Sequence, residues 1–155
     1  MPVWSADLIH VTPPPTARSP DVEDAAAGDG DSPPETAASQ RTILVVDDDP
    51  DLLELMCFAL EGEGYTVLCA SSGGAALDLL QTGAQVSLIL LDLMMPGMNG
   101  WHFFDGLSRL RGCEPPPVVV ISAATHSASP PGAASFLRKP VDLGELVDVV
   151  ARYSR

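Results

Sequence analysis

The stretch Val86-Ser87-Leu88-Ile89-Leu90-Leu91-Asp92 decides the fold of this chain, because a mostly apolar run ends on a single acid. Three further apolar runs end on polar residues, at Asp47-Asp48-Asp49, at Ser122 and at Lys139, the only lysine in the sequence. The strands of an open parallel sheet end together at one crevice, where proteins of this kind bind ligands. We therefore expect the acids, the hydroxyl and the ammonium to share one site.

The apolar runs also indicate how the sheet is covered. Residues 43–46, 86–91 and 118–121 are apolar almost throughout rather than alternating, which is typical of parallel strands with helices on both faces. The segments between them carry apolar residues at helical spacing. We predict a doubly wound α/β domain with five parallel strands over residues 41–155. The predicted strands are 43–46, 65–70, 86–91, 118–121 and 134–138, and the predicted helices begin at Pro50, at Gly73, at Asn99 and after the cap Asp142.

Residues 1–40 differ in composition from the rest of the chain. They are rich in proline and alanine and contain seven acids and one arginine. Too little apolar surface is present there to offset the entropy of ordering the backbone. We predict a disordered acidic tail, with the folded domain beginning at residue 41 and no second folded domain after the last helix.

Net charge and hydropathy restrict the partners and the compartment. The formal net charge is -13, so the surface repels nucleic-acid phosphates and acidic membranes. No apolar run approaches the roughly 20 residues of a membrane span, and no signal peptide is evident. We expect a cytoplasmic protein that binds neither nucleic acid nor membrane.

The three cysteines, Cys57, Cys69 and Cys113, are odd in number and lack the close spacing of a zinc site. Cytosolic thiols are ordinarily reduced, and a free cysteine is often buried. We expect three reduced thiols.

The polar strand ends suit phosphoryl transfer. Two carboxylates about 4 Å apart repel by roughly 4 kcal/mol at an effective dielectric of about 20, so a cluster of ionised acids favours a cation. Hard oxygen ligands without histidine or thiolate suit Mg²⁺. Asp92 is the best candidate nucleophile, since a carboxylate can accept a phosphoryl group. Lys139 and Ser122 offer an ammonium and a hydroxyl to the charged phosphoryl oxygens.

Four motifs make the chain resemble the receiver domain of bacterial response regulators. They are ILVVDDDPDLLELM (43–56), LLDLMMPGMNG (90–100), VVVISA (118–123) and FLRKPVD (136–142), and they are spread across the predicted domain. The resemblance implies a flavodoxin-like sheet with strand order 2-1-3-4-5. It also implies a stand-alone phosphoprotein of a two-component phosphorelay, which is not a turnover enzyme.

The resemblance assigns roles to individual residues. It implies that Asp92 is the phosphoacceptor, with Lys139 and Ser122 as the other catalytic groups and a cis Lys139–Pro140 bond. The implied metal ligands are Asp47, mainly through water, and Asp48, Asp92 and the Met94 backbone carbonyl. Ser122 and Phe136 correspond to the switch pair that responds to phosphorylation. The role of Asp49, outside the usual acidic pair, stays open.

The implied reaction moves a phosphoryl group from a phosphohistidine of a sensor histidine kinase or a histidine phosphotransfer protein to Asp92. The output would pass through phosphorylation-dependent contacts with a downstream protein. The resemblance also implies that the residues at two positions, here Met94 and Ala124, tune the rate of dephosphorylation. Neither of these side chains can hold a water by hydrogen bonding. We therefore expect a long-lived phosphoryl group.

One segment departs from the family pattern. Only residues 123–135 separate Ser122 from Phe136, and Pro130, Pro131 and Gly132 interrupt them. Because proline disrupts a helix interior and two loops must also fit, we expect a fourth helix that is shortened or irregular.

Two alternatives stay open. The first is a phosphatase of the haloacid-dehalogenase type, because Asp47-x-Asp49 after a strand imitates the opening motif of that family. That family places an acid pair at a strand end after its lysine, whereas the acids that follow Lys139 are predicted to lie in a helix. The second is a receiver that acts as a phosphorylation-independent binding module.

Overall fold

The computed structural model describes residues 10–11, 41–97, 99–110, 114–123 and 130–154. A six-stranded sheet forms the middle layer, with the strand order β1-β3-β2-β4-β5-β6. The five strands β2 to β6 run parallel to one another, in the order 2-1-3-4-5 when counted from Thr42. They are β2 (Thr42–Val46), β3 (Thr66–Ala70), β4 (Leu88–Asp92), β5 (Val118–Ser122) and β6 (Ser135–Arg138). The predicted fold and strand order are confirmed.

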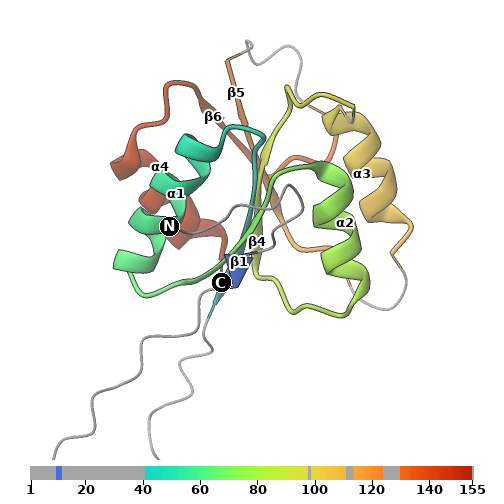
Figure 1. The fold of residues 1–155 in the computed structure, drawn as a ribbon, viewed down its shortest axis with the longest axis horizontal. Helices are drawn as coiled ribbons and strands as arrows, with labels where there is room; N and C mark the ends of the chain where they lie inside the picture. The colour runs from blue at the N-terminus through green and yellow to red at the C-terminus, as the bar shows by residue number, and fades with distance from the viewer. Residues whose placement is uncertain (1–9, 12–40, 98, 111–113, 124–129, 155) are drawn as a thin grey trace, which may run out of the picture.

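Helices cover both faces of the sheet, which explains why the central strands are apolar throughout. Helices α1 (Pro50–Gly62) and α4 (Leu143–Tyr153) lie on one face, and α2 (Gly73–Gln81) and α3 (Gly100–Ser108) lie on the other (Figure 1). Every residue of β4 and β5 is buried. The core therefore has two halves, one on each side of the sheet.

The two halves of the core are assembled from alternate residues of the same strands. Ile43 and Val45 pack with Met56 of α1 and Leu146 of α4, whereas Leu44 packs with the buried residues of α2 and α3. This alternation follows from the two-residue side-chain period of a strand. It leaves the strand ends, not the faces, available for chemistry.

Strand β1 (His10–Val11) was not anticipated from the sequence. It pairs antiparallel with β3, placing His10 opposite Cys69 and Val11 opposite Leu68. The backbone of these two residues therefore extends the sheet beyond its parallel strands. The rest of the predicted tail, residues 1–9 and 12–40, lies outside the described residues.

The crossover between β5 and β6 holds no helix in its described residues, 123 and 130–134. The Ala133 N–H donates to the Pro130 carbonyl across 3.3 Å, and Gly132 turns the chain with a φ of 100°. Residues 124–129, on which the predicted short helix mainly falls, are outside the described part of the chain. Strand β6 nonetheless pairs with β5 and completes the parallel order.

None of the helices in the described ranges combines the length and the apolar character that crossing a bilayer requires.

Candidate phosphoacceptor and metal site

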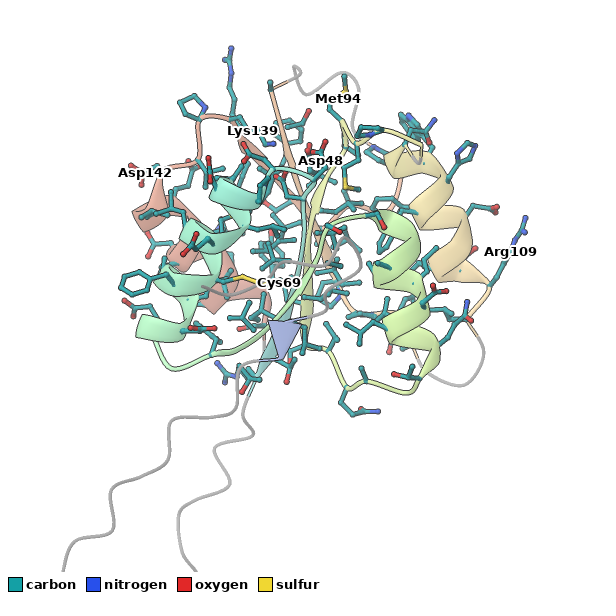
Figure 2. All side chains as sticks on the ribbon, in the orientation of Figure 1. Asp48, Cys69, Met94, Arg109, Lys139 and Asp142 are labelled. Carbon is teal, nitrogen blue, oxygen red and sulfur yellow. A yellow bond between two sulfur atoms is a disulfide. The ribbon has the colours of Figure 1, made fainter. Side chains whose placement is uncertain are left out.

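The polar residues selected from the sequence stand at the carboxyl ends of neighbouring strands. Asp47 follows β2, Asp92 ends β4, Ser122 ends β5, and Lys139 follows β6. Figure 2 shows Asp48, Met94 and Lys139 at the same end of the sheet. The parallel topology therefore brings together residues that are up to 92 positions apart in the sequence.

Asp47 is fully buried and held on both sides. Its Oδ1 accepts the Asp49 N–H at 2.9 Å, and its Oδ2 accepts Lys139 Nζ at 3.1 Å. Its own backbone N–H donates to the Ala70 carbonyl at the end of β3, across 3.2 Å. These contacts fix the carboxylate at the start of the acidic loop, which is residues 47–49 between β2 and α1.

Asp49, whose role the sequence left open, caps helix α1. Its Oδ1 accepts the N–H of Asp51 at 3.0 Å and that of Leu52 at 3.4 Å. Pro50 follows at the first helical position, where its missing N–H removes a donor that has no helical partner. A capping carboxylate satisfies free N–H groups of the first turn, so Asp49 positions the helix that leads away from the acidic loop.

Asp92 is nearly fully buried, and both of its oxygens are engaged. Oδ1 accepts the backbone N–H of Met94 at 3.0 Å, and Oδ2 accepts Lys139 Nζ at 3.2 Å. The Met94 side chain, by contrast, is 70% exposed at the rim of the site.

Lys139 joins the two buried carboxylates. Its ammonium forms ion pairs with Asp47 and Asp92, while its backbone N–H donates to the Ser122 carbonyl at 3.0 Å. The peptide bond from Lys139 to Pro140 is cis, as the resemblance implies. The lysine is thus anchored to β5 through its backbone and to β2 and β4 through its side chain.

Burial and pairing shift the pKa values of two groups. Burial raises the pKa of Asp47 above its ordinary value, against the opposing effects of the Asp49 N–H and of Lys139. Partial burial works to lower the pKa of Lys139, but its hydrogen bonds and charge pairing with Asp47 and Asp92 outweigh it, so the net shift is upward. The lysine therefore stays charged between the two acids.

The acidic cluster, which consists of Asp47, Asp48 and Asp92, fits a divalent cation. One carboxylate oxygen from each residue lies within 4.8 Å of the others. Asp48 is exposed, whereas the other two are buried, so the cluster opens to solvent on one side. Three hard oxygen donors with an open side suit Mg²⁺, which accepts few protein ligands and keeps several waters.

The two proposed switch residues lie on neighbouring strands. Ser122 is buried and stands opposite Arg138, and the half-buried Phe136 stands opposite Val120. Because strand side chains alternate between faces, Ser122 and Phe136 lie on the same face of the sheet, two positions apart. Ser122 therefore lies at the end of β5, and Phe136 lies two positions further from the strand ends on β6.

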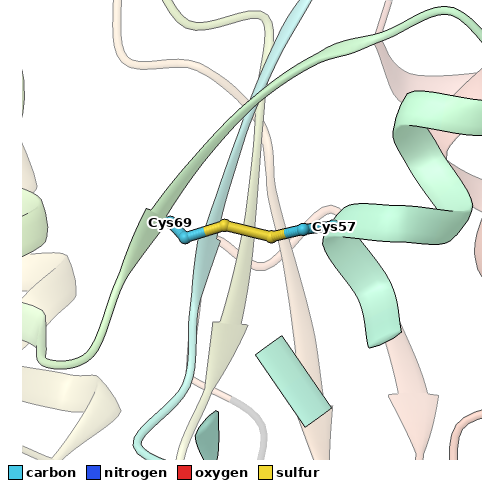
Figure 3. The surroundings of a disulfide bond; sticks show 2 residues. All are labelled: Cys57 and Cys69. Atoms are coloured by element: carbon cyan, nitrogen blue, oxygen red, sulfur yellow. A yellow bond between two sulfur atoms is a disulfide. The ribbon is translucent and has the colours of Figure 1, made fainter. Parts of the chain in front are cut away.

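The expectation of three reduced thiols is wrong for Cys57 and Cys69, which form a disulfide (Figure 3). Cys57 lies on α1 and Cys69 on β3, and these elements pack against each other. Sequence spacing could not reveal this pair, because the residues meet only through the packing of the helix on the sheet. Cys113 lies outside the described residues.

A separate cavity of about 300 Å³ lies at the amino ends of β4 and β5, between the ends of α2 and α3. Glu114 is the one charged residue among those that line it. This cavity is at the opposite end of the sheet from the acidic cluster and lacks comparable chemistry.

The family model described as "response regulator receiver domain" matches residues 43–151. Among curated proteins, the DNA-binding response regulator MtrA of Mycolicibacterium smegmatis is 37% identical over 113 residues, covering 70% of this chain and 48% of its own. An uncharacterized 14.6 kDa protein of Leptolyngbya boryana is 36% identical over 120 residues, covering 74% and 91%. This chain therefore spans about half the length of MtrA.

Solved structures agree. The CheY-like receiver domain protein of Methanospirillum hungatei is 28% identical with a TM-score of 0.67, covering 75% of this chain and 94% of its own. The response regulator TrrA of Thermotoga maritima, solved in complex with Mg²⁺-BeF, is also 28% identical, with a TM-score of 0.64 and coverages of 73% and 98%.

Proposed function

The chain belongs to the response regulator receiver family, and from this premise we propose that it takes a phosphoryl group from a partner's phosphohistidine onto Asp92. Receiver domains are signalling modules rather than turnover enzymes. The observation that carries the proposal is the shared ammonium of Lys139, 3.1 Å from Asp47 and 3.2 Å from Asp92. It brings a cation, a metal-binding acid and a nucleophile together at one strand edge.

In the proposed reaction, an Asp92 carboxylate oxygen bonds to phosphorus while the bond between phosphorus and the histidine nitrogen breaks. The electron pair of that bond leaves on the imidazole. Lys139 then offers its charge to one phosphoryl oxygen, and Ser122 offers its hydroxyl to another. The Met94 N–H, which donates to Asp92 Oδ1, orients the carboxylate for attack.

The proposed metal site comprises Asp47, Asp48, Asp92 and the backbone carbonyl of Met94. A bound Mg²⁺ would neutralise charge on the phosphoryl oxygens. Asp48 is the exposed member of the cluster, so solvent reaches the site at this residue. Asp47 is buried and already shared with Lys139, which suits it to hold the metal mainly through water.

We further propose that Ser122 moves toward the phosphoryl group and that Phe136 turns inward behind it. The common face of these residues on β5 and β6 supports a coupled movement. The changed face would bind a downstream protein, so that phosphorylation selects the partner. The donor would be a sensor histidine kinase or a histidine phosphotransfer protein.

The folded receiver is proposed to occupy residues 41–155 and to act in the cytoplasm, as is usual for its family. The name of MtrA includes DNA binding, but this chain covers about half of that protein. A net charge of -13 disfavours contact between these residues and nucleic acid, so the proposed output passes through protein contacts.

Acetyl phosphate with Mg²⁺, followed by intact mass measurement, tests the proposal. We expect a phosphate-sized mass gain in the wild type and none in Asp92→Asn. The matched control is Asp105→Asn, at an exposed aspartate of α3 paired with Arg109, which should keep the gain. A gain that persists in Asp92→Asn would place the phosphoryl group elsewhere, and no gain in the wild type would favour a binding module.

A further inference from the structure

The disulfide between Cys57 and Cys69 joins the middle of α1 to β3, as Figure 3 shows. Both residues belong to the half of the core beneath α1 and α4, where Cys57 is 8% and Cys69 is 9% exposed. Only 12 positions separate them in the sequence, so the bond closes a short loop that contains the second half of α1 and most of β3.

This bond is connected to the acidic cluster through the backbone. Ala70, the residue after Cys69, accepts the Asp47 N–H at its carbonyl. On the other side, Asp49 caps the helix that carries Cys57. The acidic loop is therefore held between β3 and α1, and the disulfide ties these same two elements together.

The chain is proposed to act in the cytoplasm, and this compartment bears on the role of the disulfide. Disulfides are rare in the reducing cytoplasm, and those that form there are usually transient, either catalytic or redox-sensing. We propose that Cys57 and Cys69 are a reversible thiol–disulfide pair whose oxidised state clamps α1 to β3 and strengthens metal binding at the acidic cluster. The coupling to metal and the cytoplasmic compartment rest on the proposed function, whereas the bond between the two cysteines does not.

The chemistry requires a disulfide oxidant of low molecular weight, such as oxidised glutathione. One cysteine thiolate attacks this oxidant, forming a mixed disulfide and releasing one thiolate. The second cysteine thiolate then attacks the protein sulfur of the mixed disulfide and releases the other. The protein loses two protons and two electrons, and the oxidant leaves as two thiols.

The first experiment examines the bond. The full chain is equilibrated in buffers of oxidised and reduced dithiothreitol of graded potential, which leave unpaired cysteines as free thiols, and is then alkylated with N-ethylmaleimide and weighed intact. We expect one added label under oxidising conditions and three under reducing conditions, with a single transition between them.

Two variants show which cysteines form the bond. Cys57→Ser should take two labels at every potential, and Cys113→Ser should keep the transition with zero and two labels. Three labels on the wild type at every potential would overturn the proposal. A bond that resists every reducing buffer would overturn its reversibility, leaving a permanent cross-link.

The second experiment measures coupling. Mg²⁺ affinity is determined by titration calorimetry on oxidised and reduced wild type, and we expect reduction to weaken binding by about threefold or more, because metal affinity depends on a preformed site. The melting temperature should also fall by about 5 °C or more on reduction. Neither quantity should respond to reductant in Cys57→Ser.

The two proposals fail differently. Equal Mg²⁺ affinity in both redox states overturns the coupling while leaving the proposed function intact. Absence of Mg²⁺ binding in both states contradicts the proposed metal site and the coupling together, while the alkylation pattern still decides whether the thiol pair exists.

Discussion

The Lys139 ammonium lies 3.1 Å from the Asp47 carboxylate, although 92 residues separate the two in the sequence. The pair is asymmetric, because Asp47 is fully buried and the lysine side chain is 24% exposed. Burial raises the pKa of Asp47 in spite of this partner. The protein therefore keeps an acid where its charge costs stability, which is expected of a site arranged for binding rather than for folding.

Replacing that acid should stabilise the fold. Asp47→Asn keeps one acceptor oxygen for the Asp49 N–H, and Lys139 keeps Asp92 as its partner. Because the substitution removes a desolvated charge, we expect the free energy of unfolding at pH 7 to rise by about 1 kcal/mol. Mg²⁺ binding should weaken in the same variant. Urea unfolding and calorimetry measure the two effects, and a variant that is less stable than the wild type would contradict the account of Asp47.

The gain should depend on pH. Since the pKa of Asp47 is raised in the folded state, the folded chain retains this proton to a higher pH than the unfolded chain does. The contribution of Asp47 to stability is thus present below its ordinary pKa of 3.8 and is lost as the pH rises through its folded pKa. The advantage of Asp47→Asn should therefore grow with pH across this window and shrink toward zero below it.

Removing the lysine should have the opposite effect on stability. Lys139→Gln leaves two buried carboxylates without their shared cation, and we expect a loss of about 1–2 kcal/mol together with slower phosphorylation by acetyl phosphate. The neighbouring Arg138 is exposed and provides a matched cation. Arg138→Gln should change neither quantity, and an equal loss in both variants would show that total charge, not the paired ammonium, matters.

The sequence predicts those features that the hydrophobic pattern and the sheet topology determine. The strands, the helices and the convergence of Asp47, Asp48, Asp92 and Lys139 were predictable because apolar runs and topology fix where parallel strands end. The cap at Asp49 is a local feature, but the sequence alone does not show which of three consecutive acids caps the helix. A capping geometry becomes visible only with the backbone in place.

Two features escaped because they depend on tertiary packing. The bond between Cys57 and Cys69 needs α1 to lie on β3, and neither cysteine count nor spacing encodes that contact. Strand β1 is two residues long and is separated from the domain by a polar segment rich in proline. The composition of this segment does not predict a strand. Pairing with β3 stabilises it, since a short strand is stable only beside another.

Packing between α2 and α3 gives a test of the fold outside the site. A Cβ at Gly106 of α3 would stand 2.6 Å from Leu77 Cδ1 of α2, closer than van der Waals contact allows. Gly106→Ala should lower the free energy of unfolding by about 1 kcal/mol, since Leu77 must move. The control Gly74→Ala, where a Cβ meets only Ser72 Oγ at 4.0 Å, should stabilise α2 slightly. Chemical denaturation measures both.

The lifetime of the phosphoryl group is a further prediction. The Met94 side chain is exposed beside Asp92 and has no group that could hold an attacking water by hydrogen bonding. We expect the phosphorylated form to decay over minutes or longer, and Met94→Asn, which adds a hydrogen-bonding amide, to decay severalfold faster. Intact mass followed over time measures the decay. A wild-type lifetime of seconds, or no change in the variant, would contradict this role for Met94.

The surface of α1 is the last test, because it concerns the donor rather than the chemistry. Phe58 is 77% exposed and Leu55 is 46% exposed, and with Asp51 and Glu54 they line a shallow hollow on the helix that leads from the acidic loop. Exposed apolar side chains gathered on one helix favour protein contact. We expect Phe58→Ala to slow transfer from a phosphorylated histidine kinase about tenfold.

The same variant should react normally with acetyl phosphate, which needs no docking surface. Trp101→Ala, at another exposed aromatic residue that is 47% exposed on α3, is the matched control and should leave both rates unchanged. Rapid-quench measurement of the two donors in parallel separates docking from chemistry. If Phe58→Ala slowed both donors equally, the side chain would act through the structure of α1, because a contact used only by a protein partner cannot change the reaction with a small molecule.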